Sequence, residues 1–268
     1  MQTNIKNGTL SMDGTTVDYI RFGSGTRTLV MLPGLGESLR SMKGTALPMA
    51  ALYRFFAKDF TVYSFSRKHQ LPENYTTRDM ARDLATALDL LDIGKVDLVG
   101  VSMGGMISQH FAADYPERVN RLVLAVTCPR HHPVMEESVG EWIGLAKAGD
   151  HAAFIDSNLR RIYSDGYYQK YRHLVPLVGG LTKPESYDRF FIQANACLNH
   201  DATQRLSCIQ AKTLVIGGGQ DSVVDPNASR ELAAGIADAT LKMYPLWGHG
   251  LYDEVPDFNQ AVLDFLLS

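Results

Sequence analysis

The chain has 268 residues, of which 45% are hydrophobic, and a formal net charge of -3. A chain of this length and hydrophobic content can bury one substantial core, so we expect a single folded unit with room for an insertion. The charge provides no broad basic surface of the kind that holds phosphates, which argues against nucleic acid as a partner.

The terminal and cysteine signals point to a cytoplasmic protein. Residues 1–23 lack both the basic start and the apolar stretch of a secretory signal, and no segment approaches the roughly 18 consecutive apolar residues of a membrane-spanning helix. Cys128, Cys197 and Cys208 cannot all pair, and none lies in a cluster with metal-ligand spacing. We therefore expect reduced cysteines, no membrane partner, no metal ion and no cofactor. No feature of the sequence predicts an oligomeric state.

Strands and helices alternate along the first half of the chain. Short runs rich in β-branched and large apolar residues, bounded by glycine, proline and aspartate, predict strands at 17–21, 28–32, 60–65, 96–99 and 122–126. Helical spacing predicts helices at 47–56 and from Thr76 or Thr77 to about Gly94. It also predicts a helix after Gly100, which carries Met106, Ile107 and Phe111 and ends before Pro116. Asp79 follows Thr76 by three residues, as in a capping box.

The pattern changes between residues 129 and 206, where strand runs vanish and helical spacing with many aromatic residues replaces them. We interpret this segment as a helical insertion into a core formed by residues 1–128 and 207–268. The alternation resumes with a strand at 213–216, a helix at 229–236, a strand at 240–244 and a helix at 258–267. Such apolar strands alternating with helices predict an α/β fold, with a mostly parallel sheet covered on both faces.

The sequence Gly100-Val101-Ser102-Met103-Gly104 matches G-x-S-x-G and lies between a predicted strand and a predicted helix. In this setting the glycines permit a sharp, strained turn that leaves the serine hydroxyl projecting above the sheet, because bulkier neighbours would collide with backbone. Gly105 would also let the helix pack close to the sheet. The alternative is a glycine-rich turn in which Ser102 only caps a helix. The flanking elements favour Ser102 as a nucleophile.

Five short motifs follow one another along the chain: LPGLG at 32–36, GVSMGG at 100–105, YPERV at 115–119, GQD at 219–221 and GHG at 248–250. Together they make the chain resemble the α/β-hydrolase fold superfamily over essentially its whole length. Within it, the resemblance is to capped serine hydrolases such as small carboxylesterases, lactonases and carbon–carbon-bond hydrolases. It implies that the insertion is a cap over the nucleophile.

A serine hydroxyl needs a base within hydrogen-bond reach and usually a carboxylate that orients this base. His249 is the candidate base, because its loop joins the last predicted strand to the last predicted helix, where the family places its base. The other seven histidines lack this setting, and we assign them to solvation or local structure.

Asp221 directly follows a glycine run after the strand at 213–216 and is the candidate acid, although it could instead turn the chain or cap a helix. Asp225 is its rival. It precedes Pro226, however, which favours an extended conformation that approaches the next helix. The order Ser102, Asp221, His249 is the chain order expected of this fold.

Charge that develops on a substrate carbonyl oxygen is met by preorganised donors, which the family takes from the backbone. By position, the N–H groups of Leu35 and Met103 would form this oxyanion hole, although Leu35 could be a simple turn residue. Pro33 stands where the family often has histidine. This departure leaves the rigidity of the loop and any side-chain contact from that position open.

The insertion would enclose an apolar acyl or aromatic group of a small-molecule substrate. Trp142 is the pocket residue that we single out, although most aromatic residues could instead form the insertion's own core, and we nominate no arginine for a substrate carboxylate. We predict hydrolysis of a small carboxylic ester or lactone through an acyl-enzyme on Ser102. Carbon–carbon-bond hydrolysis, amide or peptide hydrolysis and acyl transfer use the same triad and stay open. A ligand-binding receptor with slow turnover is the alternative of a different class.

Overall fold

The computed structural model describes residues 4–268, apart from the side chains of residues 178 and 181. The first three residues of the N-terminal segment considered above lie outside this description. Within residues 4–268, eight strands form one sheet in the order β1-β2-β4-β3-β5-β6-β7-β8. The strands are β1 (Lys6–Met12), β2 (Thr15–Gly23), β3 (Arg27–Leu32), β4 (Phe60–Phe65), β5 (Val96–Val101), β6 (Val119–Ala125), β7 (Lys212–Gly218) and β8 (Ala239–Tyr244).

The sheet is mostly parallel, as predicted. Only the pairs β1–β2 and β2–β4 are antiparallel, and the five pairs from β4–β3 to β7–β8 are parallel. Strand β1 was not predicted. The Asp13-Gly14 pair could have indicated a hairpin turn with a strand on each side, but we used it only as a strand boundary. Both residues have positive φ, 50° and 74°, as a tight hairpin turn requires.

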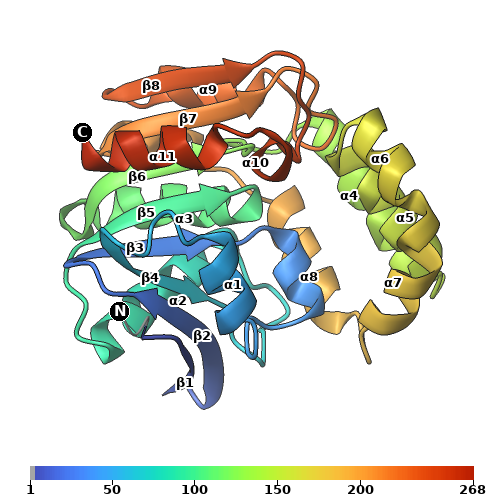
Figure 1. Ribbon diagram of the computed structural model, residues 1–268, viewed down its shortest axis with the longest axis horizontal. Coiled ribbons are helices and arrows are strands. Elements are labelled where there is room, and N and C mark those ends of the chain that lie inside the picture. Colours follow the sequence, from blue (N-terminus) through green and yellow to red (C-terminus); the bar gives the residue numbers. More distant parts are fainter. Residues whose placement is uncertain (1–3) are drawn as a thin grey trace.

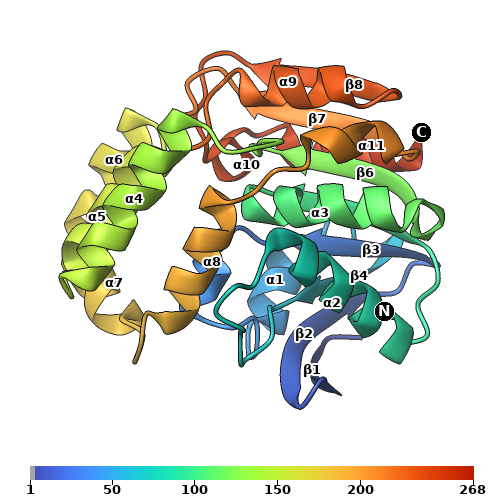
Figure 2. The same cartoon turned by 180° about the vertical axis from the view of Figure 1, so that it is seen from behind.

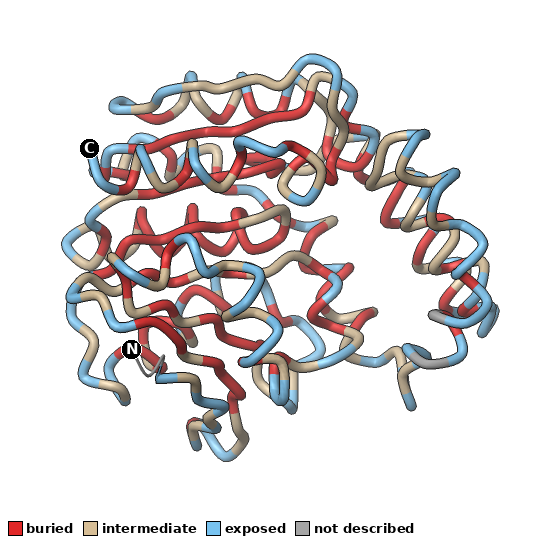
Figure 3. Tube along the Cα trace, in the orientation of Figure 1, coloured by how far each residue is buried: buried red, intermediate tan, exposed pale blue. Residues whose placement is uncertain are grey.

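Helices cover both faces of the sheet (Figures 1 and 2). Alternate strand residues point to opposite faces, so Leu98 and Leu122 belong to one buried cluster and Val99 and Val123 to the other. Figure 3 shows the buried residues concentrated along the central strands. The first face carries α2 (Thr77–Leu90), α3 (Met103–Asp114) and α9 (Ala228–Gly235), and the second carries α1 (Ala46–Leu52), α10 (Leu251–Glu254) and α11 (Phe258–Leu267).

The structure confirms the predicted start of α2 but not the predicted end of α1. The capping box of α2 is confirmed: the Thr76 hydroxyl accepts from the Asp79 N–H at 3.1 Å, and the Asp79 carboxylate accepts from the Thr76 N–H at 2.9 Å. The helix predicted at 47–56 is too long, because α1 ends at Leu52. The chain then turns inward, with the Phe56 N–H bonded to Tyr53 O at 3.1 Å, and this turn buries Phe56 before β4 begins.

Between β6 and β7 the chain is helical, and this segment stands beyond the carboxyl ends of the parallel strands (Figure 1). An antiparallel bridge between Arg130 and Asp201 joins its two ends. Its α-helices are α4 (Pro133–Lys147), α5 (His151–Ile162), α6 (Asp165–Tyr171), α7 (Val175–Thr182) and α8 (Asp188–Leu198), and its 3-10 helices are η3 (Arg172–Leu174) and η4 (Thr203–Cys208).

Cys128 and Cys197 are buried, Cys208 is half-buried, and all three are free thiols. None of the helices within residues 4–268 combines the length and the hydropathy needed to cross a membrane.

Candidate active site

Ser102 lies in a sharp turn between the end of β5 and the start of α3. Its φ is 54° and its ψ is -123°, a conformation that residues with a side chain rarely adopt. The Ser102 N–H donates to Ala125 O at 2.9 Å, which ties the turn to the neighbouring strand β6. The strained turn expected from the sequence is therefore present.

The glycines around Ser102 allow segments of backbone to approach closely. A Cβ atom on Gly104 would lie 2.1 Å from Leu32 O, so α3 can begin against β3 only with glycine at this position. A Cβ atom on Gly105 would lie 2.6 Å from the side chain of Thr127, so α3 packs closely against the loop that directly follows β6. The loop after β3 also passes over the serine, since a Cβ atom on Gly34 would be 3.3 Å from Ser102 Cβ.

His249 and Asp221 form a buried pair. His249 Nδ1 donates to Asp221 Oδ2 at 2.9 Å, and the two side chains are 4% and 2% exposed. The other carboxylate oxygen of Asp221 accepts from the N–H groups of Val223 at 2.8 Å and Val224 at 3.0 Å. Because an ionised carboxylate only accepts, Nδ1 carries the hydrogen of the neutral imidazole and Nε2 can accept a proton.

The loops that carry this pair pack directly against each other. A Cβ atom on Gly218 would lie 2.5 Å from Trp247 O, so the glycine run after β7 permits the contact. The Gln220 N–H donates to the same Trp247 carbonyl at 2.9 Å. The residues just before Asp221 and just before His249 are thus held together by backbone contacts.

Asp225, the alternative candidate for the acid, is not bonded to His249. One of its carboxylate oxygens accepts from the Asn227 N–H at 2.7 Å, and the other is 3.6 Å from His132 Nδ1. The extended conformation expected before Pro226 is wrong, because Asp225 has a φ of 77°. Aspartate tolerates this region better than most residues, and its side chain is bonded to backbone two residues ahead, as in an Asx-turn.

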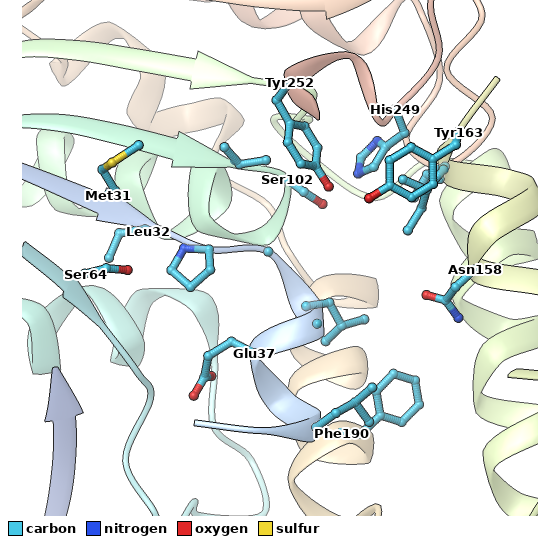
Figure 4. A pocket seen from close by; sticks show the side chains of 18 of the residues that line it. Met31, Leu32, Glu37, Ser64, Ser102, Asn158, Tyr163, Phe190, His249 and Tyr252 are labelled. Atoms are coloured by element: carbon cyan, nitrogen blue, oxygen red, sulfur yellow. The ribbon is translucent and has the colours of Figure 1, made fainter. Parts of the chain in front are cut away.

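Ser102 and His249 line one cavity of about 370 Å³. Figure 4 shows both side chains at this cavity, grouped with Tyr163 and Tyr252. No hydrogen bond within residues 4–268 joins Ser102 Oγ to His249 Nε2, and such bonds often tighten only when substrate binds. The helical segment between β6 and β7 contributes Trp142, Phe154, Asn158, Ile162, Tyr163 and Phe190 to the wall.

Some aromatic residues between β6 and β7 both pack against one another and line the cavity, and others do not reach it. Phe154 and Phe190 pack edge to face with ring centroids 5.2 Å apart, and both also line the cavity. Trp142 lines it too, and its buried indole N–H has no hydrogen-bond partner among the described residues. Tyr168 instead bonds to Asp156 on the surface of the insertion, at 3.0 Å. The insertion's own core and the cavity wall therefore share residues.

Both candidate oxyanion donors are the first N–H groups of a helix. Leu35 begins the 3-10 helix η1 (Leu35–Leu39) and Met103 begins α3. Neither N–H donates to a hydrogen-bond acceptor anywhere in residues 4–268. They lie near each other, because Gly34 is packed against Ser102.

A buried charged cluster supports the loop that contains Leu35. Glu37 is 3.8 Å from Arg67 and 3.2 Å from Arg189 of α8, and Arg67 also donates to Pro33 O at 2.6 Å. Burial raises the pKa of Glu37, and the two arginines oppose this rise. The guanidinium of Arg67 thus holds the loop through the backbone carbonyl of Pro33.

Sequence reasoning missed Glu37, Tyr252 and Asn158, all of which line the cavity. Glu37 belongs to a cluster whose partners are distant in the chain, and no local pattern marks such a cluster. Tyr252 lies on α10, which was not predicted because it spans only Leu251–Glu254. Its one signal was proximity to His249 in sequence.

Comparisons with known proteins agree with this architecture. Residues 27–147 match a family model described as the alpha/beta hydrolase fold. A 2-hydroxy-6-oxononadienedioate/2-hydroxy-6-oxononatrienedioate hydrolase of Klebsiella pneumoniae is 30% identical over 258 residues, covering 91% of this chain and 88% of the relative. A 2-hydroxy-6-oxo-6-phenylhexa-2,4-dienoate hydrolase of Comamonas testosteroni is 26% identical over 265 residues, covering 93% and 91%.

Among solved structures, an alpha/beta hydrolase enzyme from a Medee basin deep-sea metagenome library superposes with a TM-score of 0.84. It shares 24% sequence identity, with 97% of this chain and 98% of the other chain covered. At this identity the comparison supports the fold alone. The chain belongs to the α/β-hydrolase fold family, and it is an enzyme.

Proposed function

We propose that the protein is a serine hydrolase that cleaves a neutral carboxylic ester or lactone through an acyl-enzyme on Ser102. The observation that carries the proposal is that the buried His249–Asp221 pair and the strained Ser102 meet at one cavity. A nucleophile, a base and a group that orients the base are the parts that nucleophilic catalysis by serine needs.

In the proposed reaction, His249 Nε2 takes the proton of Ser102 Oγ while Oγ attacks the carbonyl carbon of the substrate. Asp221 stabilises the imidazolium that forms, and the N–H groups of Leu35 and Met103 bind the oxyanion. The proton then passes from His249 to the leaving alkoxide as the carbon–oxygen bond breaks. Water hydrolyses the acyl-enzyme in the same way, with His249 again as base.

The charge of the cavity favours a neutral substrate. The two relatives are named for dienoate and dienedioate substrates, which are carboxylates. Here no lysine or arginine is among the described residues of the cavity wall, and Glu37 is part of it. Arg67 and Arg189 lie behind Glu37, bonded to it or to backbone carbonyls. Burying a carboxylate without a partner is costly, so we favour an ester or lactone over a dienoate.

We also propose that residues 129–206 act as a cap on a core of residues 1–128 and 207–268. The apolar side chains of Trp142, Phe154 and Phe190 would surround the acyl group and exclude water from it. Apolar contacts of this kind select among acyl groups by size and shape.

The test is steady-state turnover on matched p-nitrophenyl esters. We expect many turnovers on p-nitrophenyl butanoate. An ester of similar length that ends in a carboxylate, p-nitrophenyl succinate, should have a kcat/KM at least about tenfold lower, which corresponds to about 1.4 kcal/mol. Ser102→Ala is the control for uncatalysed hydrolysis. Faster hydrolysis of a 2-hydroxy-6-oxo-dienoate than of every ester would point to carbon–carbon-bond cleavage. Release of only one equivalent of product would point to a receptor.

A further inference from the structure

The last two residues of α5 and the two residues that connect it to α6, residues 161–164, contact both loops of the candidate triad, and we call these four residues the 161–164 clamp. Ser222 Oγ donates to Arg161 O at 2.9 Å, and the Gly250 N–H donates to Ile162 O at 2.6 Å. Ser222 directly follows Asp221, and Gly250 directly follows His249. The insertion is therefore bonded one residue away from the acid and one residue away from the base.

The second half of the clamp bonds to α10, the short helix that follows the His249 loop. Tyr163 donates its hydroxyl to Asp253 Oδ2 at 2.8 Å. Ser164 donates its N–H and its hydroxyl to the two carboxylate oxygens of Glu254, at 3.0 and 2.5 Å. Burial raises the pKa of Asp253, and the bond from Tyr163 opposes this rise. The His249 loop is thus held to the insertion on its C-terminal side.

Packing leaves little room between the clamp and the His249 loop. A Cβ atom on Gly250 would lie 2.5 Å from Tyr163 Cδ1 and 2.9 Å from Ile162 O. A Cβ atom on Gly248 would be 3.6 Å from the same carbonyl oxygen. A shift of the clamp would therefore displace the residues on either side of His249.

The clamp also forms part of the cavity wall, since Ile162 and Tyr163 line the cavity. Figure 4 shows the Tyr163 ring beside the His249 imidazole. The same residues that line the cavity thus hold the backbone next to the base. Ile162 lines the cavity, and its carbonyl accepts from the Gly250 N–H, so a substrate that contacts Ile162 would also act on the placement of His249.

We propose that the 161–164 clamp is a positioning element, which keeps His249 and Asp221 where His249 can take the proton of Ser102. The inference rests on the proposed function, and it assigns to the insertion a part in the chemical step in addition to substrate choice. Displacement of a catalytic group by about 1 Å can cost about 100-fold in rate, so loosening the clamp is expected to lower kcat more than it raises KM.

The test uses the double variant Ser222→Ala/Glu254→Ala, which removes three hydrogen bonds of the clamp through residues that do not line the cavity. With p-nitrophenyl acetate we expect kcat to fall about tenfold or more while KM changes less than about twofold. The rate of labelling by a serine-directed phosphonate should fall in parallel. The conservative double variant Ser222→Thr/Glu254→Gln keeps a hydroxyl and an acceptor and should restore most of the rate.

The matched control is Arg130→Gln, which breaks another contact between the insertion and the core. Arg130 donates to Glu231 Oε1 at 2.7 Å, and Glu231 belongs to α9 and not to either triad loop. This variant should keep the wild-type kcat. All rates are normalised to the folded fraction, measured by circular dichroism and thermal unfolding.

A wild-type kcat and labelling rate in the double alanine variant would overturn the proposal, and so would a loss of rate that the unfolded fraction explains or that Arg130→Gln reproduces. If the double variant does not fold, Ser222→Ala alone is judged by the same criteria. Failure of the proposed function would give a different result from failure of the clamp proposal, because the wild-type protein itself would then not be labelled at Ser102.

Discussion

Two buried histidines predict a loss of stability in mild acid. His110 on α3 and His200 after α8 are 5% and 1% exposed, and their rings meet edge to face with centroids 5.2 Å apart. Thr77 Oγ1 lies 2.9 Å from His200 Nδ1. His110 Nδ1 and His200 Nε2 have no hydrogen-bond partner among the described residues. No carboxylate is bonded to either ring among the described residues, although the charges of Asp114 and Asp201 act on His110 and that of Asp201 acts on His200.

Burial lowers the pKa of His110 to about 4 and that of His200 to about 3, from an ordinary value of 6.5. The positive charge of His110 lowers the pKa of His200 further, and the nearby carboxylates oppose both shifts without cancelling them. The native state therefore keeps both rings neutral at pH values where the unfolded chain takes up protons. The stability that depends on these two neutral histidines is fully present above pH 6.5, and it is lost as the pH falls from there towards 4. Between pH 8 and pH 5 each histidine should cost roughly 2 kcal/mol, and the pair roughly 4 kcal/mol.

The assay is urea unfolding at pH 8, 6.5 and 5, with wild type and the single variant His200→Gln. Glutamine can keep a bond to Thr77 but does not titrate, so we expect the variant to lose about half as much free energy of unfolding as the wild type between pH 8 and 5. His173→Gln, at an exposed position, is the control and should follow the wild type. Glu37, whose raised pKa acts in the opposite direction, is common to all three proteins. Equal losses in wild type and His200→Gln would refute the reasoning.

Three further predictions concern the site and the turn around Ser102. Asp221→Asn should lower kcat by about 10⁴-fold because it favours the wrong imidazole tautomer, whereas Asp225→Asn should cost little; the reverse ranking with one ester would move the assignment to Asp225. Trp142→Ala should change the ranking of acyl groups more than the rate with a small acetate ester, and a collapse of that rate in a folded variant would contradict this. Gly104→Ala should lower the free energy of unfolding in urea by about 3 kcal/mol or more, because the added Cβ meets Leu32 O. Gly140→Ala is the control: it lies in open space on α4, and the substitution should be neutral or stabilising by about 0.5 kcal/mol. Equal effects of the two substitutions would contradict the steric argument.

Features encoded by neighbouring residues could be predicted from the sequence. The elbow at Ser102 depends on glycines within two residues of it, and the capping box at Thr76 depends on a spacing of three. The alternation of apolar strands and helices likewise predicts the mostly parallel sheet. In each case the physical cause is local, because short-range sterics and hydrogen bonds set the backbone conformation.

Features that depend on contacts between distant segments could not be predicted. The Glu37–Arg189 pair joins residues 152 positions apart, and the contact between Ser164 and Glu254 spans 90. No periodicity encodes such pairs, because they follow from how the helices between β6 and β7 pack against the rest of the chain. The choice between Asp221 and Asp225 depends on both local and distant features. The position directly after the glycine run favoured Asp221, but only the fold shows which carboxylate contacts His249.

Labelling of the intact protein with a serine-directed phosphonate tests the central claim most directly. The protein is incubated with the reagent, the adduct is counted by intact mass and located by peptide mapping, and residual esterase activity is measured in the same samples. We predict one adduct per chain, on Ser102, with activity lost in proportion to labelling. Ser102→Ala, with unchanged thermal unfolding, should show neither adduct nor turnover. An adduct on a different residue, or most of the activity retained in folded Ser102→Ala, would contradict the assignment of Ser102 as nucleophile.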